Sequence, residues 1–206
     1  MKKFIILAFL VTVFTSFSFS ANYETYTGLT YNHGIFLEND DYSKSIFTNG
    51  INFSMTTYFL PSNWGFYING NGNLGYSMKY TGNDVSLKYT SSDWSMNVIL
   101  SAIIGPSFKY DINDKFHVFA SGGLHLSETM FNSEKMADIL NFSFGLGADL
   151  GFRFKPTKKF YLTAGTFITH DFFQLRTTTL SFREEKTRGY YNFTSFKPYI
   201  GIGFIR

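Results

Sequence analysis

The stretch from Leu140 to Phe154 alternates strictly between apolar and polar side chains, so it has the period of two residues that predicts a β-strand. One face carries leucine, phenylalanine and alanine, and the other is mostly glycine, serine and asparagine. Strands of soluble proteins usually have about 5–6 residues, but a tilted strand that crosses a bilayer needs roughly 9–11. Small polar residues also suit the interior of a narrow barrel. We therefore predict a transmembrane β-strand, with lipid on one face and a packed lumen on the other.

Seven more segments show the same alternation, and the connections between them are mostly short and long in turn. The predicted strands are 25–37, 47–59, 65–80, 96–110, 116–127, 140–154, 160–172 and 196–206. Outer-membrane barrels have an even number of strands, short periplasmic turns and longer outer loops. We predict an all-β fold for residues 21–206, an eight-stranded antiparallel transmembrane (outer-membrane) β-barrel. Side chains fill so small a barrel, so a diffusion porin is not expected, and a narrow channel requires lumen charges that leave a gap.

The amino terminus has the pattern of an export signal. Two lysines precede an apolar run from Phe4 to Phe14, and small residues follow near Ser20. We predict a Sec-type signal peptide over residues 1–20, cleaved after Ser20. Export of a chain without cysteine suits the outer membrane of a double-membraned bacterium. Without those two lysines the 18 basic residues fall to 16 against 15 acidic ones, which gives no electrostatic case for binding nucleic acid.

The alternation continues into two of the long connections. Val85, Leu87 and Tyr89 keep the period of two, and so does the segment 174–183 before the polar sequence EEKTRG. We expect both hairpins to extend past the membrane as β-ribbons, with the polar sequence as a turn. An unpaired strand edge there can bind a surface protein partner by adding a strand; stiffening of the loops is an equal alternative.

Four charged residues lie on the predicted lumen face, namely Lys79, Lys109, Asp149 and Arg153. A lone charge in a narrow lumen is costly, so we expect each of them to have a partner inside the barrel. In this interpretation the charges close the lumen and have no other role.

The four histidines show no metal-ligand spacing. Their positions in the alternating pattern place His33 and His170 on the outer face, and His117 and His125 in the lumen. We expect His125 about two residues from the outer rim, where a histidine can act as a general base or form a lumen hydrogen bond. Ser127 lies on the same face of the same strand, which hints at an activated serine.

The most specific polar segment is FLENDDYSKSIFTNGINFS, residues 36–54. Glu38, Asn39 and Asp40 gather oxygen atoms at the rim of the barrel, which suits a hard cation such as calcium. Thr48 and Asn49 are expected across the hairpin from them. By itself the segment is equally well an ordinary polar loop with Asx turns.

The sequence END at Glu38–Asp40, followed by FTNG at Phe47–Gly50, resembles the amino-terminal signature of the outer-membrane lipid A deacylases that remove the 3′-linked acyloxyacyl group. The resemblance implies an ester hydrolase that acts on lipid A in the outer leaflet. It implies that Asn39, Asp40 and Thr48 are active-site residues and that the enzyme uses calcium.

Two main functions therefore remain open, beside the narrow channel named above. The first is a non-enzymatic barrel, surrounded by outer-membrane lipid and lipopolysaccharide, whose outer hairpins interact with surface partners or support the envelope; it needs no cofactor. The alternative is the lipid A deacylase, with calcium bound by Glu38 and Asp40 and with His125 as the base. His125 and Ser127 are also similar to the His-x-Ser of a second, eight-stranded lipid A deacylase family.

Overall fold

The computed structural model describes residues 23–38, 45–59, 62–82, 85–89, 96–132, 138–180, 183–189 and 193–206. The predicted signal peptide and residues Asn39 and Asp40 lie outside this part of the chain. The strands are β1 (Tyr23–Glu38), β2 (Ser45–Phe59), β3 (Trp64–Gly82), β4 (Val85–Tyr89), β5 (Met96–Asp111), β6 (Phe116–Asn132), β7 (Asp138–Phe154), β8 (Phe160–Leu180), β9 (Arg183–Gly189) and β10 (Phe193–Ile205). Within the described residues no helix is long and apolar enough to cross a membrane.

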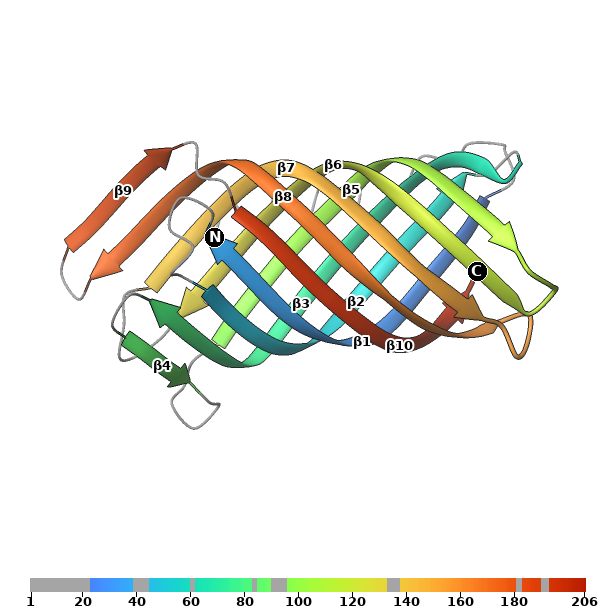
Figure 1. Ribbon diagram of the computed structural model, residues 1–206, viewed down its shortest axis with the longest axis horizontal. Coiled ribbons are helices and arrows are strands. Elements are labelled where there is room, and N and C mark those ends of the chain that lie inside the picture. Colours follow the sequence, from blue (N-terminus) through green and yellow to red (C-terminus); the bar gives the residue numbers. More distant parts are fainter. Residues whose placement is uncertain are drawn as a thin grey trace.

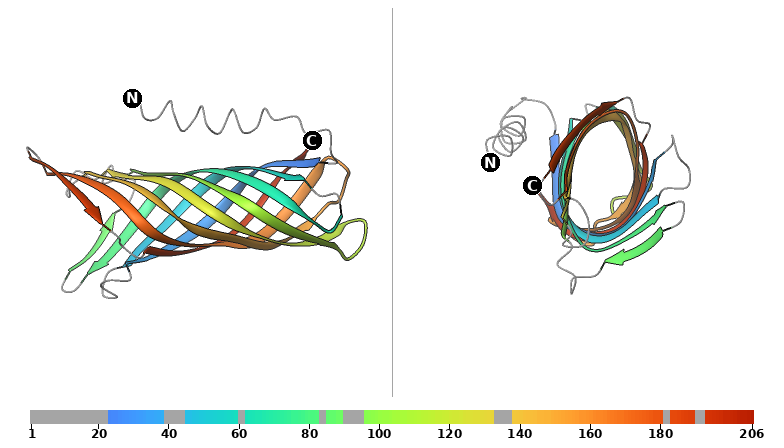
Figure 2. Two further views of the ribbon diagram at one scale, coloured as in Figure 1. Left: turned by 90° about the horizontal axis from the view of Figure 1, so that it is seen from above. Right: turned by 90° about the vertical axis from the view of Figure 1, so that its left-hand side faces the viewer.

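Eight of these strands form a closed antiparallel ring, as the sequence predicts. Their order is β10, β1, β2, β3, β5, β6, β7 and β8, and β8 pairs again with β10 to close the barrel. Figure 2 shows this ring seen end-on, and Figure 1 shows the strands tilted along the barrel axis. Strands of 13 to 21 residues are long enough to cross a bilayer at such a tilt.

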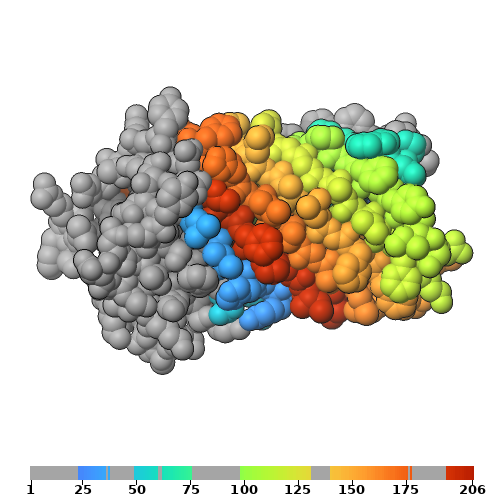
Figure 3. Space-filling view, viewed as in Figure 1, coloured from blue at the N-terminus to red at the C-terminus, as the bar shows by residue number. Residues whose placement is uncertain are grey.

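The outer face of the ring is apolar and the inner face is mostly polar. Leu29, Ile51, Leu146 and Ile200 are each more than half exposed, whereas the serines, threonines and asparagines between such residues are buried. Figure 3 shows the outer surfaces of β8, β10 and β1 as diagonal bands packed side by side. A continuous exposed apolar surface of this kind needs lipid to cover it.

Several strands run further than the alternation predicts. β6 continues to Asn132, five residues past the predicted end at Ser127, because Glu128–Asn132 pair with β5 and Thr129 remains buried inside. β3 and β8 continue past the ring and pair with β4 and β9. Figure 1 shows both extensions at the same end of the barrel, opposite the short turns, which confirms the two predicted ribbons. The sequence EEKTRG is not a turn, because it belongs to β9.

Two register shifts interrupt the ladders of the described strands. In β8 the pairing moves from Gly145–Asp171 to Phe144–Phe173, so Phe172 is a bulged residue. An extra residue in one strand reverses the alternation beyond it. Both Asp171 and Gln174 are therefore buried, although they are three residues apart. A similar shift lies between Asn49 and Gly50 where β2 pairs with β3.

Two glycines allow β5 and β6 to approach closely. A Cβ atom on Gly105 would overlap the backbone of Gly122 and Gly123, and one on Gly123 would overlap the Ile104 carbonyl. Pro106 follows directly and has no N–H to donate to the ladder. The ladder between the two strands is interrupted at this point, between the Ile104–Leu124 and Ser107–Ser121 pairs.

Candidate functional site

Arg153 fills the lower lumen, at the end of the barrel that carries the short turns. Its side chain is 6% exposed, and its Nη2 donates a hydrogen bond of 2.9 Å to the hydroxyl of Tyr58. The guanidinium carbon lies 4.1 Å from the ring centroid of Tyr26 and 4.0 Å from that of Phe119. Arginine stacks well on aromatic faces. The predicted partner of this charge is therefore an aromatic cage rather than a carboxylate in direct contact.

This arginine packs against a cluster of buried aromatic residues, four of which, Tyr26, Tyr58, Phe119 and Tyr161, have their rings within 6 Å of its guanidinium. The members of the cluster are Tyr26, Tyr58, Tyr67, Phe119, Tyr161, Phe167 and Tyr199, with Ile103 beside them. The rings of Tyr26 and Tyr161 meet edge to face at 5.3 Å, and Tyr199 donates a 2.8 Å hydrogen bond to the buried carboxylate of Asp149. Asp149 thus has a partner in the lumen, as expected. The cluster confirms that side chains fill this part of the interior.

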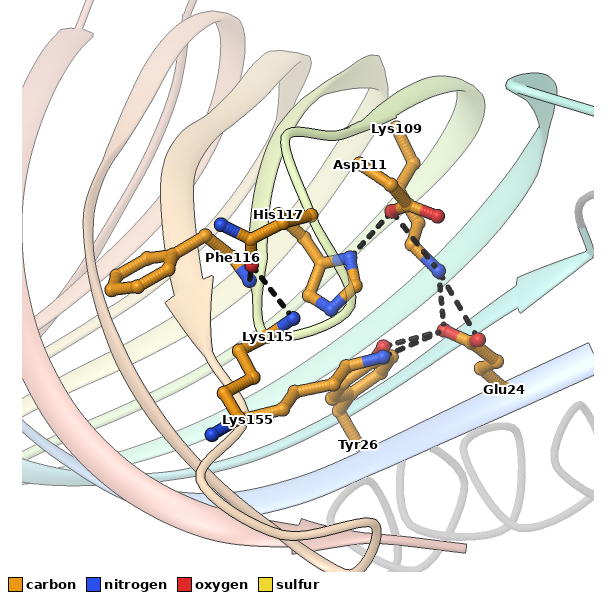
Figure 4. Close-up of polar contacts among 9 residues, drawn as sticks. Glu24, Tyr26, Lys109, Asp111, Lys115, Phe116, His117 and Lys155 are labelled. Atoms are coloured by element: carbon orange, nitrogen blue, oxygen red, sulfur yellow. Dashed lines mark hydrogen bonds and ion pairs between the residues drawn. The ribbon is translucent and has the colours of Figure 1, made fainter.

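Charged residues form a network of contacts at the mouth of the barrel at the turn end (Figure 4). Lys109 Nζ lies 2.9 Å from Glu24 Oε2 and 3.7 Å from Asp111 Oδ1, and His117 Nδ1 also hydrogen-bonds Asp111. Lys155 Nζ lies 3.6 Å from the same Glu24 oxygen. Burial lowers the pKa of Lys155 below its ordinary value, and the Glu24 carboxylate opposes this shift. Lys109 and His117 thus face inward, as predicted, whereas the side chain of Lys79 lies outside the described part.

A second polar network occupies the middle of the lumen and includes His125. His125 Nδ1 donates to Asp171 Oδ1 at 2.7 Å, and Ser143 Oγ donates to Asp171 Oδ2 at 2.9 Å. Ser127 Oγ lies 2.7 Å from Ser143 Oγ. Because Ser143 gives its one proton to Asp171, Ser127 is the donor in this last bond. All four side chains are buried.

This network includes the predicted pair of His125 and Ser127 but does not activate the serine. A nucleophilic hydroxyl must donate to the imidazole that removes its proton, and Ser127 donates to Ser143 instead. Asp171 lies on the inward-facing side of the predicted strand 160–172, but its contact with His125, 46 positions away on another strand, could not be found from alternation within single strands. The expectation for the height of His125 was also wrong, because β6 continues seven residues beyond it.

A small cavity of about 20 Å³ adjoins His125. Its polar lining includes Asn32, Asn52, Asn73, Thr169 and Lys197. Such a volume has room for one or two water molecules. The amide oxygen of Asn73 is buried there without a hydrogen-bond partner in the described part of the protein, so a water molecule in this cavity would satisfy it.

The rim segment is only partly described. Glu38 and Thr48 belong to β1 and β2, but their side chains, like Asn39 and Asp40, lie outside the described part. The register corrects one expectation, because Thr48 pairs with Gly34 and therefore lies four positions below Glu38 on the neighbouring strand. Among the described residues no three histidine, aspartate or glutamate side chains are placed to hold a metal ion. The proposed active-site and calcium roles of this segment stay predictions.

Two histidines face outward, as their parity predicts, and each contacts a polar side chain on a neighbouring strand. His33 Nδ1 lies 2.7 Å from Asn49 Oδ1, which also accepts a 3.2 Å hydrogen bond from the hydroxyl of Tyr31. His170 Nδ1 lies 3.0 Å from Thr194 Oγ1. Hydrogen bonding between neighbours lowers the cost of polar groups on a lipid-facing surface.

No protein-family model and no curated protein sequence matches this chain. Several solved structures share its architecture. The outer membrane protein OprG from Pseudomonas aeruginosa gives a TM-score of 0.55 at 11% identity, over 90% of this chain and 96% of that chain. The fold is that of a small outer-membrane β-barrel.

Two further structures agree. Neisserial surface protein A gives a TM-score of 0.50 at 12% identity, over 87% of this chain and 96% of that chain. The outer membrane protein AlkL, solved in DMPC lipid bilayers, gives 0.50 at 13% identity, over 92% of this chain and 93% of that chain. At such identities the likeness is one of fold, and function must be argued from the residues.

Proposed function

We propose that this chain is a non-enzymatic integral outer-membrane protein that acts at the cell surface through its two projecting β-ribbons. The ribbons themselves carry this proposal. β4 pairs only with β3, and β9 only with β8, among the described strands. Each ribbon therefore has an outer edge of backbone N–H and C=O groups. Such an edge binds an extended segment of another polypeptide by adding a strand.

The closed interior supports a function outside the lumen. Arg153 and the aromatic cluster fill the lower half, and the charges around Lys109 close the mouth below it. A solute has no evident path through so packed a core. Outer-membrane lipid and lipopolysaccharide contact the apolar outer face, and the ribbons are the parts that extend beyond it.

The lipid A deacylase remains the alternative, and the position of His125 argues against it. The acyl chains of lipid A lie against the outside of a barrel, whereas His125 is 2% exposed and faces the lumen. A general base must come within hydrogen-bond reach of its substrate, directly or through one water. An enzyme would thus need a base other than His125 beside Asn39, Asp40 and Thr48.

The absence of cysteine makes the ribbons easy to test. Lys88→Cys in β4 and Lys186→Cys in β9 each introduce a single thiol, and Lys158→Cys in a short turn is the matched control. On intact cells a membrane-impermeant maleimide should label the two ribbon thiols and should label the control only after permeabilisation. A thiol-to-amine cross-linker should then give a discrete protein adduct from at least one ribbon.

The adduct separates the two functions. Thr187→Pro, placed beside the Lys186→Cys thiol, disrupts β9 and should abolish its adduct while the barrel stays folded. Mass spectrometry of lipid A from the same cells, with calcium supplied and Asp40→Ala as control, should show no change. The deacylase would replace our proposal if two results came together. Lipid A would lose an acyloxyacyl mass in cells with the wild-type protein but not in cells with Asp40→Ala, and neither ribbon would give an adduct.

A further inference from the structure

Three aromatic pairs mark the turn end of the barrel on its outer side. Each pair consists of residues directly opposite in register on neighbouring strands, namely Trp64 with Phe108, Phe116 with Phe154, and Phe160 with Phe204. Their ring centroids lie 4.7, 4.6 and 6.1 Å apart, and one member of each pair is well exposed. Aromatic residues gather at the level of lipid headgroups. This end of the barrel therefore meets a membrane interface at the aromatic pairs.

Two of the short turns have the same construction just beyond these aromatics. In Asn113–Phe116 the side-chain oxygen of Asn113 accepts hydrogen bonds of 2.9 Å from the backbone N–H groups of the third and fourth residues. In Thr157–Phe160 the hydroxyl of Thr157 accepts the corresponding bonds at 3.4 and 3.1 Å. Both turns end in Lys-Phe. Each therefore holds a lysine next to an aromatic residue at the interface.

The two turns adjoin, so their lysines gather on one side of the barrel. The backbone N–H of Lys155 donates to the carbonyl of Lys115 at 2.7 Å, which joins the start of one turn to the end of the other. Lys115, Lys158 and Lys159 are exposed. Lys155 points inward to Glu24 instead and does not belong to this group.

The acidic residues nearby do not cancel these three charges. Asp111 already contacts Lys109 and His117 in the mouth of the barrel. Asp114 is the remaining carboxylate in the two turns. The exposed surface around the turns thus keeps a positive excess where it meets the headgroups.

We propose that Lys115, Lys158 and Lys159 form a binding surface for the phosphate groups of anionic phospholipids, in the leaflet that faces the turn end. The phenylalanines beside them contact the glycerol and upper acyl region, while the ammonium groups contact the phosphates. Lysines near an anionic membrane surface contribute about a fivefold gain in affinity each. The inference rests on the proposed membrane location but not on the ribbons or on any surface partner.

Lipid retention by the purified full chain tests this surface. The protein is placed in nanodiscs of equal parts phosphatidylglycerol and phosphatidylcholine, and native mass spectrometry counts the lipids that stay bound after release. Wild type is compared with a K115Q/K158Q/K159Q variant. The matched control, R183Q/K186Q/R188Q, neutralises three charges in β9 at the opposite end. Heat-modifiable migration on gels confirms that each variant is folded.

Wild type should retain phosphatidylglycerol over phosphatidylcholine, and the turn variant should lower this preference at least tenfold while the β9 control leaves it unchanged. K115R/K158R/K159R should keep the preference, and added salt should weaken it. Equal retention of the two lipids by wild type, or an equal loss in the β9 control, would overturn the proposal. Neither result bears on the cross-linking of the ribbons, so the two proposals can fail separately.

Discussion

Arg153 Nη2 and the hydroxyl of Tyr58 form a 2.9 Å hydrogen bond across the full width of the barrel. Their strands, β7 and β2, are four steps apart in either direction around the ring of eight, so they are diametrically opposite. One side chain thus joins opposite walls through a hydrogen bond and through the rings of Tyr26 and Phe119. Side chains therefore fill the cross-section of the lumen at the level of Arg153.

Arg153→Ala should destabilise the barrel more than a change on its surface. The substitution removes the hydrogen bond that Arg153 donates to the buried Tyr58 hydroxyl and removes the cation from the aromatic cage. We expect a loss of about 2–4 kcal/mol in the free energy of unfolding. Urea unfolding from lipid vesicles measures it, with the surface change Lys158→Ala as the control. Equal stability of the two variants would contradict the role given to Arg153.

Asp171→Ala should lower the free energy of unfolding, because Asp171 joins the polar network in the middle of the lumen. Asp171 accepts from both His125 and Ser143, so its removal leaves the buried Nδ1–H of His125 without an acceptor and takes one of the two hydrogen bonds of Ser143. We expect a loss of about 3–5 kcal/mol. Ser107→Ala is the matched control, because it removes only one hydroxyl of the Ser107–Ser121 pair, and it should cost about 1 kcal/mol. A cost for Asp171→Ala no larger than that of the control contradicts this account of the network.

Arginine substitutions on the outer face should report its depth in lipid. Leu146 is 54% exposed in the middle of β7, and Phe204 is 67% exposed near the end of β10. Leu146→Arg should cost about 2–4 kcal/mol and Phe204→Arg about 0–1 kcal/mol, because the cost of a charge falls toward the interface. Unfolding from vesicles provides both values. Equal costs at the two positions would be inconsistent with a membrane-spanning barrel in this orientation.

Gly123→Ala should be far more harmful than Gly72→Ala. A Cβ atom on Gly123 would overlap the carbonyl of Ile104 in the neighbouring strand, whereas one on Gly72 meets only a Leu100 methyl at 3.5 Å. We expect the first change to cost about 3 kcal/mol or more and the second less than about 1 kcal/mol. The folded yield after dilution into detergent or vesicles shows the difference. A normal yield for Gly123→Ala would mean that β5 and β6 are further apart than described.

Lys155 should make stability depend on pH. Its pKa in the folded protein lies below its ordinary value of 10.5, chiefly through burial. Between the folded and unfolded pKa values the unfolded state binds more protons, so the free energy of unfolding should rise as pH rises toward 10.5. Lys155→Met removes the titrating group and should flatten this part of the profile relative to wild type. Parallel profiles would show that burial does not control this lysine.

The barrel could be predicted from the sequence because most membrane-facing residues are apolar and their neighbours along each strand face the lumen. Leu146 and Gly147 illustrate the rule, which repeats through the strands and needs no knowledge of long-range contacts. The ribbons were predictable because the period of two residues continues into 85–89 and 174–183.

The contents of the lumen could not be predicted in the same way. Tyr26 and Tyr58 are inward residues, yet tyrosine is also common on the outer face of a barrel, so its type does not reveal its side. Alternation places Asp171 in the lumen but does not reveal its contact with His125, 46 positions away. The bulge at Phe172, beyond which Gln174 is buried, has no clear mark in a single sequence. The contact between Arg153 and Tyr58 joins residues 95 positions apart, which alternation within one strand cannot reveal.

We infer that side chains close the interior of the barrel to solutes. Current through purified wild-type protein in a planar bilayer tests this claim most directly. We predict no steady ohmic conductance, and we predict its appearance in the Arg153→Ala/Tyr58→Ala variant if that variant still folds. A steady conductance in wild type, unaffected by these substitutions, would contradict the closed interior and make the channel the better interpretation.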